Sequence, residues 1–129
     1  MNKVRCFVSF DYDNDLSQYN LLIGQSRKED SPFEIADWSI KEAISRDWED
    51  KARQKIKQCE VVIVLCGKNT HTATGVSKEL EIAQNENINY FLLGAYSNGG
   101  NTKPIAAKYS DKIYDWTWDN LKALIHGGR

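Results

Sequence analysis

Apolar and polar positions follow one another along the chain in blocks that predict strands alternating with helices. The most distinct block is 61–66, an unbroken apolar run rich in β-branched residues. Such a run is too short for a typical helix and is typical of a strand buried on both faces, as in a parallel sheet. Gly67 to Thr70 then supplies a turn signal. The pattern therefore places this strand at the centre of the fold.

The other blocks predict an alternating α/β chain. Further strands are expected over Val4–Phe10, Pro32–Ala36, Ile88–Gly94 and Lys112–Asp115. Helices are expected from Leu16 onward with Asn14 or Asp15 as N-cap, over Asp47–Gln58, over Thr74–Glu86, and after a capping Thr117. This alternation predicts one domain over residues 1–129, a three-layer flavodoxin-like parallel sheet of order 2-1-3-4-5 with helices on both faces.

In such a sheet the ligand lies beyond the carboxyl ends of the strands, where the first and third strands diverge. The loops after the first, second and third strands would converge on that crevice. We therefore expect the crevice to be lined by Phe10, Asp11, Tyr12, Asp37, Trp38 and Gly67.

Glu79 is the residue on which the functional interpretation depends. On a helical wheel of about 100° per residue, it falls within the apolar arc formed by Val76, Leu80 and Ala83, whereas Glu81 points away. Burying an unpaired carboxylate is costly, so an inward glutamate needs a reason. One reason is structural: a carboxylate at the start of a helix is favoured by the helix dipole or is paired with a lysine. The other reason is a catalytic role.

Composition narrows the function classes. The net charge of −1 gives no general attraction to nucleic acid or to an anionic membrane. No apolar segment reaches the length of a membrane span, and the chain enters a strand pattern without signal-peptide features. The three cysteines lack metal-ligand spacing, so we expect reduced, buried thiols, a cytoplasmic protein and no metal site.

Two functions common on this fold fit poorly. A phosphate-receiving domain needs an aspartate at the end of the third strand, which here ends Leu65-Cys66-Gly67. A flavodoxin needs a phosphate-binding loop after the first strand, where the acidic segment 11–15 would repel a phosphate.

A third possibility rests on a family resemblance. The segments that carry it are 8–13, 33–37, 63–70 and the Val-x-x-Glu-Leu sequence of 76–80. Together they resemble the bacterial Toll/interleukin-1 receptor (TIR)-like family, which includes the TIR subunit of Thoeris anti-phage systems. The resemblance covers about Val4 to Ala83 and departs at Gly75, where many relatives have a tryptophan.

The resemblance implies an enzyme that cleaves NAD at the nicotinamide–ribose bond, with Glu79 as the catalytic carboxylate and NAD as substrate rather than cofactor. It also implies hydrolysed or cyclic ADP-ribose products, self-association, and a downstream effector activated by the product. Loss of nicotinamide leaves an oxocarbenium-like ribose that a nearby carboxylate stabilises. A non-catalytic TIR-like interaction module is the alternative, and a module that binds a nucleotide without turning it over ranks third.

Overall fold

The computed structural model describes residues 3–36 and 47–127. The described strands are β1 (Val4–Ser9), β2 (Phe33–Ile35), β3 (Val61–Cys66), β4 (Asn89–Gly94) and β5 (Ile113–Tyr114). The described helices are α1 (Tyr12–Ser26), α2 (Trp48–Lys57), α3 (Thr74–Asn85), α4 (Trp118–Ile125) and the short 3₁₀ turn η1 (Thr70–Thr72). None of the helices in these ranges has the length and apolar character that crossing a membrane requires.

The strands form one sheet of order β2-β1-β3-β4-β5, and each neighbouring pair is parallel. The predicted order is confirmed. Every residue of β3 is buried, as a strand flanked by two others and covered on both faces must be. Ser9 pairs with Val64 and Cys66 pairs with Gly94, so β1, β3 and β4 all end along one side of the sheet. We call this side the carboxyl edge.

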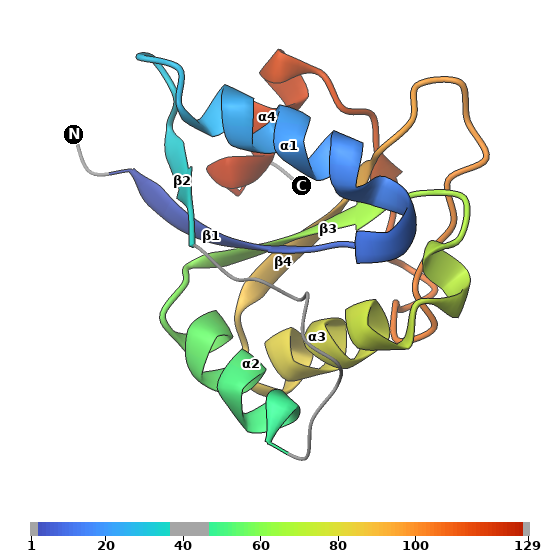
Figure 1. Cartoon of the computed structure of the whole chain (residues 1–129). Helices are drawn as coiled ribbons and strands as arrows, with labels where there is room; N and C mark the ends of the chain where they lie inside the picture. Colours follow the sequence, from blue (N-terminus) through green and yellow to red (C-terminus); the bar gives the residue numbers. More distant parts are fainter. Residues whose placement is uncertain (1–2, 37–46, 128–129) are drawn as a thin grey trace.

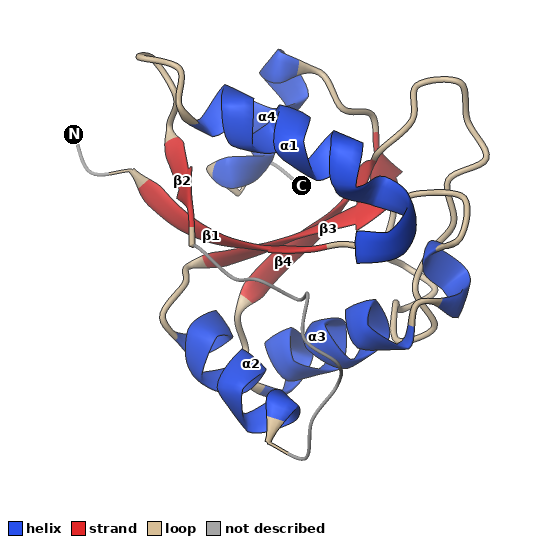
Figure 2. Ribbon diagram, in the orientation of Figure 1, coloured by secondary structure: helices blue, strands red, loops and turns tan. Residues whose placement is uncertain are grey.

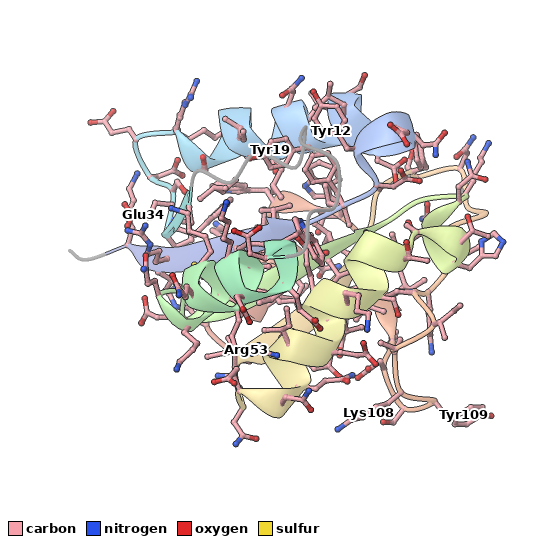
Figure 3. All side chains as sticks on the ribbon, turned by 60° about the horizontal axis from the view of Figure 1, so that its bottom comes forward. Tyr12, Tyr19, Glu34, Arg53, Lys108 and Tyr109 are labelled. Atoms are coloured by element: carbon pink, nitrogen blue, oxygen red, sulfur yellow. The ribbon has the colours of Figure 1, made fainter. Side chains whose placement is uncertain are left out.

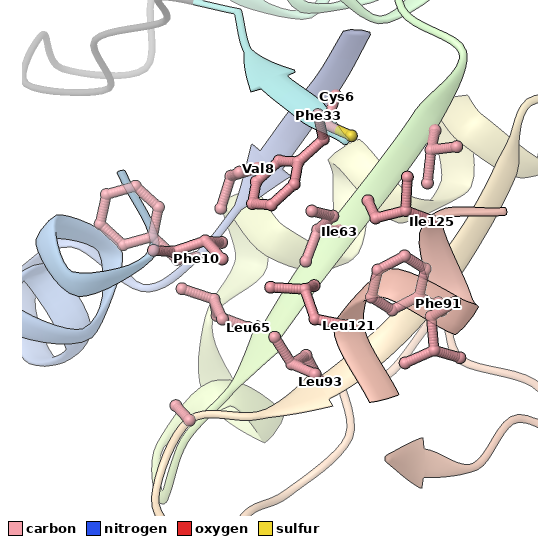
Figure 4. Packing of buried hydrophobic residues seen from close by; sticks show 14 residues of the cluster. Cys6, Val8, Phe10, Phe33, Ile63, Leu65, Phe91, Leu93, Leu121 and Ile125 are labelled. Carbon is pink, nitrogen blue, oxygen red and sulfur yellow. The ribbon is translucent and has the colours of Figure 1, made fainter. Parts of the chain in front are cut away.

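The molecule has three layers, because α1 and α4 cover one face of the sheet while α2 and α3 cover the other (Figures 1 and 2). Each face has its own hydrophobic cluster. On the α1/α4 face, Leu121 of α4 belongs to the same cluster as the strand residues Phe33 of β2 and Phe91 of β4 (Figure 4). Burial of this apolar area on both sides of β3 is the main force that holds the layers together.

On the other face, α2 packs against α3. The predicted inward stripe of Trp48, Ala52 and Ile56 is buried, which confirms the interpretation of α2. At the far end of the pair, Arg53 lies 3.7 Å from a carboxylate oxygen of Glu86 (Figure 3). Both side chains are partly exposed, so this ion pair contributes little to stability compared with the buried stripe.

The helix starts are only partly as the sequence pattern predicts. Thr117 caps α4 as expected, because its side chain accepts a hydrogen bond from the backbone N–H of Asn120. The predicted cap of α1 was wrong. Asp11 is the N-cap and accepts from the backbone N–H of Asp13, so α1 begins earlier than the apolar period indicated. Asp15 lies inside the helix instead, and its side chain is buried.

Candidate active site

Glu79 lies on α3 and points into the molecule. Its side chain is 0 % exposed, and its helical neighbours Val76, Leu80 and Ala83 are buried with it. Glu81 is exposed. The predicted inward direction of Glu79 is therefore confirmed. Its surroundings on this face are mostly apolar, so a full charge here requires polar partners.

One partner of Glu79 comes from the end of β1. The hydroxyl of Ser9, itself fully buried, donates a hydrogen bond of 2.6 Å to Glu79 Oε1. Ser9 is the last residue of β1, at the carboxyl edge, and is 70 positions away from Glu79 in the sequence. A short hydrogen bond from a hydroxyl to a carboxylate is stronger than one between neutral groups and fixes the position of the acceptor. The fold thus holds the glutamate at the edge where ligands bind in sheets of this kind.

A second carboxylate, Asp15, is buried on the opposite face of the sheet. It is 1 % exposed and occupies a non-helical turn of α1, with φ −119° and ψ 19°. Tyr96 donates its hydroxyl to Asp15 Oδ1 at 2.8 Å. Asp15 Oδ2 is buried and has no hydrogen-bond partner. Burial raises the pKa of Asp15, the Asp11 carboxylate raises it further, and the bond from Tyr96 lowers it.

Gly67 follows β3 and is in close contact with Asp15. A Cβ atom at Gly67 would lie 2.5 Å from Asp15 Oδ2, so no larger residue fits there without movement. Its backbone N–H donates to the Thr70 hydroxyl at 2.7 Å, and its carbonyl accepts from the backbone N–H of Thr102 at 2.9 Å. The close approach that a glycine permits is therefore filled by a side chain of the same chain.

The aromatic residues after β1 face the α1/α4 side. Phe10 is buried, and its ring stacks on Tyr19 with a centroid distance of 4.2 Å. Tyr12 is half-buried, and its ring lies 6.1 Å from that of Phe10. Tyr12 and Tyr19 both project from α1 (Figure 3). Asp37 and Trp38 lie outside the described residues. The substrate-lining role assigned to this group stays a prediction.

The segment after β4 is tied down across the carboxyl edge. Tyr96 donates to Asp15, and Asn101 exchanges hydrogen bonds with the backbone of Tyr96. The Thr102 hydroxyl donates to the Gly67 carbonyl at 3.0 Å and lies 3.1 Å from Nδ1 of His71. The segment lacks regular secondary structure, as predicted, yet it is anchored to α1 and to the loop after β3.

Two cavities lie near the outer strands. The larger, about 870 Å³, is at the carboxyl ends of β4 and β5 and is lined by Gln18, Tyr96, Asn98 and Trp116 among others. The smaller, about 470 Å³, is at the amino ends of the same strands and is lined by Asn89, Tyr90, Lys108 and Asp111 among others. The linings contain neither Glu79 nor any of the four predicted crevice residues that the structure describes.

The cysteines are free and buried, as expected. Burial raises the pKa of the Cys66 thiol to about 12, so this sulfur stays protonated and is a poor nucleophile. Within residues 3–36 and 47–127, no group of three His, Cys, Asp or Glu side chains is placed to hold a metal ion.

Comparison with known proteins decides the family. A family model described as the TIR-like domain of Thoeris protein ThsB matches residues 7–102, most of the chain. The chain belongs to this family. The resemblance expected from the sequence motifs is thereby confirmed, and the TIR-like match extends beyond Ala83 to include the anchored segment after β4.

A solved structure is also similar. The crystal structure of a prokaryotic SEFIR domain matches with 21% identity and a TM-score of 0.59, covering 96% of this chain and 91% of that one. At this identity the likeness shows a shared fold and nothing more about activity. No curated protein matches the chain.

Sequence reasoning missed the pairing of Asp15 with Tyr96. Three aspartates lie within residues 11–15, before the apolar period of α1, and Asp11, directly after the predicted strand, is the cap. That choice would have left Asp15 on the inward side and in need of a partner. Tyr96, 81 positions away, carried no sequence signal that linked it to Asp15.

Proposed function

We propose that this chain is a TIR-type enzyme that cleaves the nicotinamide–ribose bond of NAD, with Glu79 as the catalytic carboxylate. The observation that carries the proposal is the placement of Glu79. A fully buried glutamate, aligned by Ser9 at the carboxyl edge, is held where a parallel α/β sheet binds ligands. Membership of a TIR-like Thoeris family adds to it.

The chemistry fits a fixed carboxylate. As nicotinamide leaves, positive charge develops on the ribose, and a negative oxygen positioned beforehand lowers the energy of that state. Ser9 contributes by fixing one oxygen of Glu79, so the other oxygen has a defined direction. An apolar surrounding strengthens this electrostatic effect because the local dielectric constant is low.

The wider proposal concerns signalling. Water attack on the ribose would yield ADP-ribose, and attack by a hydroxyl or ring nitrogen of the same molecule would yield a cyclic isomer. Either product would serve as a signal to a downstream effector in anti-phage defence. Free, buried cysteines are compatible with the reducing cytoplasm, where we expect the protein to act as a homo-oligomer.

The test compares NAD turnover by the wild-type chain, Glu79→Gln and Glu81→Gln, with products separated by chromatography and mass. Glu81 is an exposed carboxylate on the same helix, so its variant controls for changes in helix charge. We expect nicotinamide release by the wild type and Glu81→Gln, and none by Glu79→Gln. The assay includes high protein concentration and infected-cell lysate, since assembly or infection can be the trigger.

The outcomes separate the candidate mechanisms. The product mass distinguishes hydrolysis from cyclisation. Equal turnover by Glu79→Gln and wild type would refute the role of Glu79. If the protein is folded by circular dichroism and shows no NAD turnover under any condition, the proposed enzymatic activity would be refuted.

The second candidate is a TIR-like interaction module without catalysis. It is favoured by large apolar side chains that are exposed to solvent in the segment between β4 and β5, where Tyr109 is 103% exposed and Ile105 is 80% exposed. Tyr109 and Lys108 project from the body of the molecule (Figure 3). Exposed aromatic side chains are enriched at protein interfaces. Loss of partner binding in Tyr109→Ser, with no NAD turnover by the wild type, would support this function.

A further inference from the structure

Trp48, the first residue of α2, has a buried polar atom without a partner. The side chain is 7 % exposed, and its indole Nε1 is fully buried with no hydrogen-bond acceptor. A buried indole N–H usually finds an acceptor, because leaving it unpaired costs free energy. The packing of Trp48 in the core therefore leaves one buried hydrogen-bond donor without an acceptor.

The Trp48 indole lies beside the first turn of α3. A Cβ atom at Gly75 would lie 3.9 Å from Trp48 Cζ2, and Cζ2 and Nε1 are both bonded to the same ring carbon. The unpaired donor is thus two bonds away from the ring atom nearest Gly75. Gly75 is four residues before Glu79, so the two share one face of α3, one turn apart.

The start of α3 adds further donors. The helix begins after Ala73, which makes no side-chain cap hydrogen bond. The first backbone N–H groups of a helix have no partner within the helix and carry a partial positive charge. The indole N–H and these amides are therefore donors concentrated at one place, one turn from the buried glutamate.

We propose that Trp48 and the first turn of α3 form a substrate subsite in which the indole N–H donates to an oxygen of a dinucleotide. The identification of that ligand as NAD rests on the proposed function. NAD carries suitable acceptors in the nicotinamide carboxamide and in the pyrophosphate. The absence of a side chain at Gly75 keeps this turn of α3 close to the indole, since even a Cβ atom there would lie 3.9 Å from Trp48 Cζ2.

The direct test follows the indole N–H resonances of isotope-labelled protein during titration. The chain has four tryptophans, and the peak missing from Trp48→Phe identifies Trp48. Trp116 is the matched control, because its indole already donates to Gln25 Oε1 at 2.8 Å. We expect a saturable shift of the Trp48 peak with NAD and an unshifted Trp116 peak. Nicotinamide and ADP-ribose, added separately, show which of the two groups supplies the oxygen.

Kinetics provide a second readout. In Trp48→Phe the ring remains and the N–H is lost, so we expect KM for NAD to rise about tenfold, the loss of one hydrogen bond. Trp116→Phe should leave KM unchanged. A Trp48 that only fills the core would lower the melting temperature of the variant without changing KM or responding to NAD.

The outcomes separate a failure of the proposed subsite from a failure of the proposed NAD cleavage. NAD turnover with no shift of the Trp48 peak and an unchanged KM would overturn the subsite and leave the proposed function standing. A saturable Trp48 shift without turnover would support the subsite and refute NAD cleavage. Neither shift nor turnover would overturn both.

Discussion

Two carboxylates are buried at the carboxyl edge, one on each face of the sheet, and the structure holds them in different ways. Glu79 comes from a regular turn of α3 and accepts from Ser9 on the adjoining strand. Asp15 comes from an irregular turn of α1, accepts from Tyr96 on a loop and lies against the backbone of Gly67. Both are almost completely inaccessible to solvent.

This comparison shows that burial alone does not identify a catalytic acid. Asp15 joins α1 to the loops after β3 and β4. These structural contacts are a sufficient reason for its burial. Glu79 is aligned by Ser9 of β1 and lies one helical turn from Gly75, which is next to the Trp48 indole. We therefore propose a structural role for Asp15 and a catalytic role for Glu79, and the predictions below test that division.

The largest expected difference is in NAD turnover. Replacing each carboxylate by its carboxamide keeps the size and removes the charge. We expect Glu79→Gln to lose at least about 100-fold in turnover, the scale of a missing acid–base group. Asp15→Asn should keep most of the activity, because Tyr96 can still donate to the amide oxygen. Turnover is measured by nicotinamide release. Comparable losses of turnover in the two folded variants would contradict the assignment of different roles to Glu79 and Asp15.

The next effect concerns the close contact beneath Asp15. Gly67→Ala would force a methyl group against a buried carboxylate, and we expect a loss of about 1–3 kcal/mol in unfolding free energy by urea titration. Gly24→Ala in α1 is the control. Nothing lies within 4 Å of that Cβ position, so the change should be neutral or stabilising. Truncation in Asp15→Ala should relieve the strain, so Gly67→Ala should cost less in that background.

Removing the hydroxyl donor from each carboxylate sharpens the comparison. Ser9→Ala leaves Glu79 Oε1 without this bond, which we expect to cost about 1–3 kcal/mol and to lower turnover as well. Tyr96→Phe should cost about 0.5–1.5 kcal/mol, because the raised pKa of Asp15 lets that group become neutral more easily. Urea unfolding measures both. A larger loss of unfolding free energy in Tyr96→Phe than in Ser9→Ala would contradict the expected order of the two hydrogen bonds.

The smallest effect is a pH dependence from Asp15. Its pKa is raised above 3.8 in the folded protein, chiefly by burial, so the folded state binds this proton more tightly than the unfolded state does. That contribution is complete below pH 3.8 and is lost as the pH rises through the folded pKa. The stability of wild type relative to Asp15→Asn should therefore fall with rising pH over that window. If the unfolding free energies of wild type and Asp15→Asn changed in parallel with pH, the pKa of Asp15 would not be raised in the folded protein.

Much of the candidate site could be anticipated from sequence because its parts follow local rules. A helical wheel places Glu79 inward without knowledge of its partner, and the alternation of blocks predicts which strand ends share an edge. The cap of α1 was misplaced because Asp11, Asn14 and Asp15 all satisfy the local preference for a short polar side chain before a helix. Only contacts with Tyr96 and Gly67 separate them.

The sequence by itself predicted the strand order through the alternation of strands and helices. It also predicted the two-faced burial of β3 and the inward direction of Glu79, since hydrophobic periodicity is a property of neighbouring residues. The tertiary structure alone decided which hydroxyl aligns Glu79, which carboxylate lies against Gly67, and that the indole N–H of Trp48 is buried without an acceptor beside α3. These are contacts between residues far apart in the chain. Their geometry depends on how the layers pack, and no local pattern encodes it.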